Sequence, residues 1–249
     1  MAQSSGPQIS LKRFYEAVTV AAEPVGGFSV RLDGRAVRTP AKALLAAPTA
    51  ALAELIAGEW AAQGEMVHIA AMPASRLAYT AIDRIGPARA AVAAEVARMG
   101  GADVLCYFAE APQALFERQA RRWGPVLDWA RDELELDFVR ITGALHKAQP
   151  AETLARIEAL ALAEDDFALA GLSLATGLFH SAVLALALRR DQLDGAAAFD
   201  LSRLDEAFQE EQWGIDAEAA ARTERLRAEA VMLERWFLAL SRGAGARSP

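Results

Sequence analysis

Acidic side chains gather around a tryptophan near the end of the chain, in the stretch FQEEQWGIDAE at residues 208–218. Glu206, Glu210 and Asp216 place carboxylates within about three helical turns, and a pair of carboxylates can serve a hydrolase as general acid and general base. Such a pair, however, normally flanks a cleft and comes from separate elements. Three interpretations therefore stay open: a solvated helix face, a protein-binding face anchored by Trp213, and an acid/base site.

A helical wheel at about 100° per residue divides this stretch into two faces. An apolar stripe, which should face the core, contains Leu201, Leu204, Phe208 and Ile215. Glu211 borders that stripe, within about 60° of its centre, together with Gln212. Trp213, Glu206 and Glu210 fall nearly opposite. Because a carboxylate beside an apolar face is costly unless it is paired, we expect an arginine or another donor near Glu211, or else a surface position that awaits a partner.

Other side chains that could do chemistry are few. The sequence has no glycine-rich phosphate loop, no nucleophile elbow and no His-Glu-x-x-His motif. Its three histidines have no cysteine or acidic residue at metal-ligand spacing, and they are His68, His146 and His180. Cys106 lies in the apolar stretch DVLCYF, where a small buried hydrophobe is favoured over a nucleophile. We therefore expect no metal site.

The first hundred residues predict the mixed part of the fold. The stretch FSVRLDGRAVRTP alternates apolar and polar residues around Asp33-Gly34, a strong hairpin signal, and Val18 with Val20 suggests a further strand. Thr49 is a plausible N-cap for a helix that continues toward Gly64. Trp60 falls on the apolar side of that helix, so we expect a core tryptophan that covers the sheet.

Beyond Gly100-Gly101 the pattern is almost wholly helical, with stretches near residues 112–134, 151–163, 165–190 and 200–240. We therefore predict an α+β fold. An N-terminal mixed domain with antiparallel strands and short helices should occupy residues 8–108, and a C-terminal all-α domain should occupy residues 109–242.

The composition limits the class of protein. With 53% hydrophobic and 24% charged residues, the chain resembles an ordinary globular protein, and its formal net charge of −7 argues against a nucleic-acid partner. The charge-free segment 167–188 contains many small residues, which favours a helix packed on all sides over a membrane span. A single cysteine fits a reducing compartment, and we expect the bacterial cytoplasm.

Seven motifs, in this order, resemble the chaperone family that assembles the catalytic head of ATP synthase, in particular the assembly factor for the α subunit, of mitochondrial and alphaproteobacterial type. The motifs are KRFYEAV, LDGRAVRTP, GEWAAQG, MPASRLAYTAID, DVLCYF, RQARRWGPVLDW and EEQWGID, and the resemblance as a whole extends from about residue 11 to residue 235. Arg76 departs from an otherwise small and apolar run, and the tail after Arg235 shows no family feature.

The resemblance implies a chaperone without enzymatic activity or cofactor. Its partner would be the unassembled α subunit of ATP synthase, and it would act as a monomer in the bacterial cytoplasm or, in a eukaryote, the mitochondrial matrix. Structural roles are implied for Trp60 and Asp83. Partner-binding roles are implied for the last motif and its neighbour: Glu211 first, Glu210 second, then Trp213, Gln209 and Asp216. The alternative is a hydrolase of unrecognised type that uses Glu206, Glu210 or Asp216.

Overall fold

The computed structural model describes residues 10–143 and 147–241. The chain forms two compact units: residues 1–87 with 235–249, called here the strand unit, and residues 88–234, called here the helical unit. Two helices have residues in both units, α3 (Gly86–Gly100) and α10 (Ala217–Ser241). Antiparallel strands in the first unit and helices in the second confirm the predicted α+β class.

The sheet of the strand unit is built around β3 (Phe28–Leu32), which pairs antiparallel with three other strands. These strands are β2 (Val18–Ala22), β4 (Arg35–Ala36) and β5 (Ala46–Ala47). The predicted hairpin is confirmed, because Asp33 and Gly34 join β3 to β4 with φ values of 48° and 77°. Positive φ at both positions is what a tight type I′ turn requires. A separate antiparallel pair joins β1 (Ser10–Lys12) to β6 (Met66–His68).

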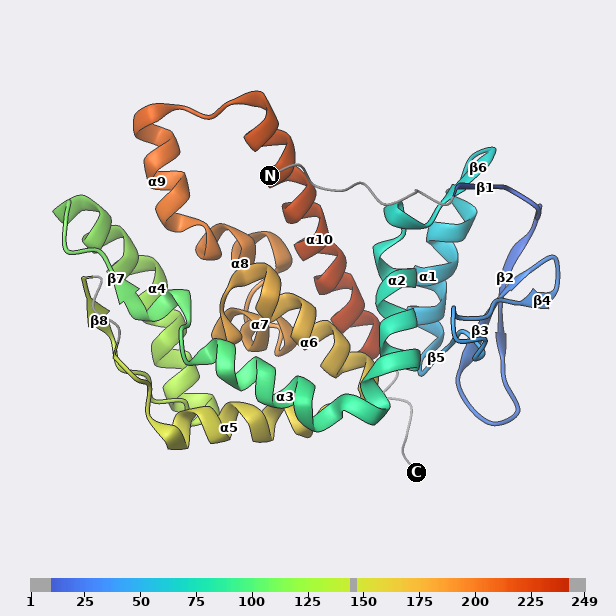
Figure 1. Cartoon of the computed structure of the whole chain (residues 1–249), viewed down its shortest axis with the longest axis horizontal. Coiled ribbons are helices and arrows are strands. Elements are labelled where there is room, and N and C mark those ends of the chain that lie inside the picture. The colour runs from blue at the N-terminus through green and yellow to red at the C-terminus, as the bar shows by residue number, and fades with distance from the viewer. Residues whose placement is uncertain (1–9, 144–146, 242–249) are drawn as a thin grey trace. The chain divides into compact units, whose positions relative to one another are not determined.

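Helix α1 (Ala50–Ala61) packs on β2, β3 and β5, and α2 (Pro73–Thr80) packs on α1 (Figure 1). Thr49 caps α1 as predicted, since its hydroxyl oxygen accepts from the amide of Leu52 at 3.1 Å. The same hydroxyl donates to the carbonyl of Ala239 at 2.8 Å, which ties the last turns of α10 into this unit. Helix α2 is followed by a π-helical turn, η2 (Ala81–Ile85).

The helical unit is arranged around α7 (Ala182–Arg189), which packs on α4, α6 and α8. Residues 182–188 of α7 are all buried. The neighbouring helices are α4 (Gln113–Leu134), α5 (Ala151–Leu162), α6 (Asp166–Phe179), α8 (Gly195–Ser202) and α9 (Leu204–Trp213). A short parallel pair, β7 (Tyr107–Phe108) with β8 (Ile141–Thr142), accompanies them.

Two long helices expected from the pattern are each divided. The stretch 165–190 breaks at His180, which has a φ of 50°, and Ser181 then caps α7 by accepting from the amide of Leu184. The stretch 200–240 is three helices, because it breaks near Arg203 and again after Gly214, whose φ is 80°. Among the described residues, no helix has the length and apolar character needed to cross a membrane.

The compact units divide the chain after residue 87, whereas the sequence suggested a boundary near residue 108. Residues 88–108 pack with the helical unit: a Cβ on Gly100 would lie 2.6 Å from Cδ1 of Ile157. The buried carboxylate of Asp103 accepts from the amides of Leu105 and Val183, both at 3.1 Å. Asp103 thus caps the turn that begins at Val104. The folding domains 8–108 and 109–242 stay a prediction.

Candidate functional site

The last predicted site residues lie where α9 ends, in a segment called here the α9 tip (residues 209–216). In the view of Figure 1, the connection from α9 to α10 lies at the opposite end of the helical unit from α5. Trp213 is 87% exposed on the last turn of α9, and Ile215 is 45% exposed beyond it. The stripe expected to bury Ile215 is therefore interrupted, because Gly214 ends the helix before that residue.

Glu211 has the arginine that its position beside the apolar face predicted. Arg118 of α4 donates from both terminal nitrogens to the two oxygens of Glu211, at 2.6 and 2.8 Å. The Arg118 guanidinium also lies 4.9 Å from the ring centroid of Phe208, a cation–π distance. Hydrogen bonds from Arg118 hold the pKa of Glu211 below its usual value. The Glu211 side chain is still 53% exposed, so one face of this ion pair is open to a partner.

Two further side chains of α4 position α8 and α9. Gln119 donates to the carboxylate of Asp205 at 2.8 Å, and Trp123 donates from its indole nitrogen to the carbonyl of Leu201 at 2.9 Å. Burial raises the pKa of Asp205, while the hydrogen bond from Gln119 opposes that shift. The sequence reasoning did not assign Arg118 or Gln119. The sequence did contain one indication of both residues, because they precede a core tryptophan, Trp123, in the same amphipathic helix.

The remaining acidic residues have separate partners. Glu210 accepts from Arg203 at 2.9 Å, and Asp216 caps α10 by accepting from the amide of Ala219 at 2.8 Å. Glu206 and Gln209 are exposed on α9. Glu210 is thus engaged by a cation and Asp216 by a helix N-terminus, an arrangement that positions α9 and α10. It does not place Glu210 and Asp216 as two free carboxylates across a cleft, as a glycoside hydrolase would need.

Trp60 and Asp83 lie apart from the α9 tip, in the strand unit. Trp60 is 5% exposed on the face of α1 that packs on the sheet, and its carbonyl accepts from the hydroxyl of Tyr15 at 2.7 Å. Asp83, in η2, accepts from the hydroxyl of Thr39 at 2.6 Å and from the amide of Ala41 at 3.1 Å. Both residues make contacts within their own unit, and the structural roles implied for them stay a prediction.

The described histidines, His68 and His180, and Cys106 lie outside the α9 tip. Among the described residues, no group of histidine, cysteine and acidic side chains could hold a metal ion. His146 lies outside the described residues. Cys106 is fully buried, and burial raises the pKa of its thiol. A thiol in that state is a weak nucleophile, as the apolar stretch around it predicted.

Comparison with known proteins agrees with the resemblance seen in the motifs. Residues 12–131 match the family model described as ATP12 chaperone protein. The structure of a candidate chaperone from Agrobacterium tumefaciens is 42% identical and has a TM-score of 0.87, with 93% of this chain and 87% of that chain covered. The structure of Atp12 from Paracoccus denitrificans is 40% identical and has a TM-score of 0.85, with 91% of this chain and 97% of that chain covered. The chain therefore belongs to the ATP12 chaperone family.

Proposed function

We propose that this chaperone assists the assembly of ATP synthase by binding the unassembled α subunit of its catalytic head. The membership of the ATP12 family and the seven ordered motifs support this proposal. A subunit made for an alternating ring exposes a large apolar interface before it is assembled, and such a surface invites aggregation. A chaperone on that surface raises the soluble population of the subunit, and the β subunit displaces it by competing for the same surface.

The observation that carries the proposal is the exposure of Trp213. A tryptophan is seldom left 87% exposed, and exposed aromatic residues in a polar surround are typical anchors of protein interfaces. Glu211 lies two residues before it, with Glu210 as the second candidate for contact with the α subunit. Gln209 and Asp216 complete the proposed contact surface.

Binding of this kind requires neither a cofactor nor hydrolysis of a substrate. The chaperone would act as a monomer, since one shape-matched surface is enough to hold one α subunit. Its location would be the compartment where the catalytic head is assembled, the bacterial cytoplasm or the mitochondrial matrix. Trp213 would then act only by occupying an apolar site on the α subunit until the β subunit replaces it.

Co-expression with the α subunit tests the function. The unmodified chain should convert the α subunit from aggregate to a soluble 1:1 complex, measured by size-exclusion chromatography of the lysate. Trp213→Ala should lower the yield of that complex about tenfold or more, the effect of losing an interface anchor. The matched control is Val25→Ala, because Val25 is 95% exposed in the strand unit and lies outside the proposed surface. Full recovery of the complex by Trp213→Ala would remove the α9 tip from the proposal.

A further inference from the structure

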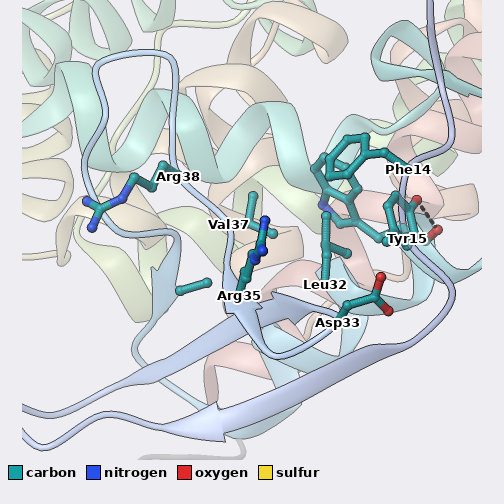
Figure 2. A pocket seen from close by; sticks show the side chains of 9 residues that line it. Phe14, Tyr15, Leu32, Asp33, Arg35, Val37 and Arg38 are labelled. Carbon is teal, nitrogen blue, oxygen red and sulfur yellow. Dashed lines mark hydrogen bonds between the residues drawn. The ribbon is translucent and has the colours of Figure 1, made fainter.

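A pocket of about 560 Å³ opens beside the β3–β4 turn of the strand unit (Figure 2). Its apolar lining includes the buried side chains of Tyr15, Leu32, Val37 and Trp60. Phe14, also in the lining, is 66% exposed. The volume lies within the range of pockets that bind small molecules or single side chains of a partner. The pocket therefore offers an apolar site with an exposed aromatic residue at its edge.

Two arginines give this pocket a positive edge. Arg35 and Arg38 both line it, and Figure 2 shows Arg35 extending alongside Val37. Within the described part of the chain, Arg35 makes no hydrogen bond, although its charge acts on the carboxylate of Asp33, while Arg38 donates to the carbonyl of Lys42 at 2.9 Å. An exposed guanidinium that donates no hydrogen bond, such as that of Arg35, can make a bidentate contact with a further carboxylate.

The acidic residue of the pocket does not neutralise both cations. Asp33 accepts from the amide of Ala17 at 2.8 Å and from that of Glu16 at 3.1 Å. These hydrogen bonds hold the pKa of Asp33 below its usual value. Because its oxygens accept from backbone amides, the Asp33 carboxylate holds the β3–β4 turn against the segment at residues 16–17. The pocket retains an excess of positive charge, in a chain whose formal net charge is −7.

One lining residue carries a donor without a partner. The indole nitrogen of Trp60 is buried and has no hydrogen-bond partner among the described residues, although the indole of Trp123 donates to a carbonyl. A buried donor left without an acceptor is destabilising and uncommon. An oxygen of a bound peptide would supply the acceptor once the lining side chains adjust, a change that is frequent at interfaces.

From these contacts we propose that the pocket binds an acidic peptide segment of the α subunit, an inference that rests on the proposed function. An apolar side chain of that segment packs against Phe14 and Val37, and a neighbouring carboxylate pairs with Arg35. The α9 tip, with its acidic residues, favours a surface of the opposite charge. Two binding sites of opposite sign restrict which surface of the α subunit can engage both, and so add specificity to binding.

Co-expression of full-length variants with the α subunit separates this inference from the function it rests on. Arg35→Glu and the double variant Arg35→Glu/Arg38→Glu should lower the yield of soluble complex about tenfold, the scale of a lost charge-assisted contact. Arg84→Glu, an exposed arginine of the same unit outside the pocket, should retain it. If the unmodified chain leaves the α subunit insoluble, both proposals fail. If it forms the complex and the pocket variants do so equally, only the pocket inference fails.

Nuclear magnetic resonance of the ¹⁵N-labelled chain tests contact at the pocket directly. The probes are short overlapping synthetic peptides that cover the α subunit sequence, and Trp60→Phe assigns the Trp60 indole resonance. An acidic peptide should shift that resonance, whereas its counterpart with amides in place of carboxylates should shift it less, and Arg35→Glu should abolish the shift. A complex with the α subunit, combined with no shift from any acidic peptide, would overturn the proposed contact.

Discussion

Glu211 pairs with Arg118 of α4, yet 53% of its side chain stays exposed. The wheel placed this carboxylate beside the apolar stripe, and the cost of burial then predicted either a cation or another donor close to it, or a surface position that awaits a partner. Arg118 is such a cation, but it lies 93 residues away in the sequence. Periodicity within one stretch relates residues of the same helix, so it could not select this arginine. By contrast, the position of Trp213 opposite the apolar stripe could be predicted, because it depends only on the periodicity of its own helix.

An exchange of charges across this pair separates contact from positioning. Exposed ion pairs contribute about 0–1 kcal/mol, so Glu211→Lys should fold and still lose binding of the α subunit. The double variant Arg118→Glu/Glu211→Arg restores an ion pair with its charges reversed. If Glu211 contacts the α subunit, pull-down should stay defective in the double variant. The same exchange at Arg98 and Glu95, an exposed pair on α3, should leave binding unchanged. Full recovery by the first exchange would show that Glu211 only holds α9 in place.

The state of Cys106 gives a second prediction about a single residue. Its thiol is buried and its pKa is raised by burial, so little thiolate is accessible in the folded chain. The native protein at pH 8 should react with 5,5′-dithiobis(2-nitrobenzoic acid) far more slowly than the same protein unfolded in guanidinium chloride, as followed by absorbance. Equal rates in the two states would contradict the burial of this cysteine.

Helix boundaries in the second half of the chain were harder to predict than helical content. Alanine-rich periodicity continues across residues 200–240, while the breaks depend on backbone conformations that few residues determine. Gly214 was visible as a possible stop, yet a glycine inside a helical pattern is often tolerated. The break near Arg203 has no glycine or proline to mark it. As a result the direction of the α9 tip, and with it the exposure of Ile215, could not be obtained from the sequence.

The contact of α8 with α10 predicts a strong effect of a single methyl group. A Cβ on Gly195 would lie 2.3 Å from the carbonyl oxygen of Ala230, a backbone atom that cannot rotate away. Gly195→Ala should therefore lower the free energy of unfolding by about 2 kcal/mol or more, measured by urea denaturation. Gly177→Ala in α6 is the control, because its Cβ would meet no atom within 4 Å. Helix propensity should make that variant more stable by up to about 1 kcal/mol. Equal stability of the two variants would show that α8 can move away from α10.

The strand unit as a whole depends on residues from the far end of the chain. Trp236, Phe237 and Leu240 are buried, and the carbonyl of Ala239 accepts from the hydroxyl of Thr49. The sequence indicated an N-terminal mixed part and a helical remainder, both of which are present. It could not indicate that the last turns of α10 return to the first unit, because amphipathic periodicity identifies a buried face and not the surface that covers it.

This dependence predicts that the N-terminal part does not fold by itself. A fragment of residues 1–108 lacks Trp236, Phe237 and Leu240, whose side chains each contribute about 2 kcal/mol or more by burial, and a domain of this size has little stability in reserve. Its amide resonances should show poor dispersion, and its thermal transition by circular dichroism should be broad. A chain that ends at residue 241 keeps those side chains and should melt as cooperatively as the full chain. A cooperative transition in the fragment would instead support residues 8–108 as a domain that folds without α10.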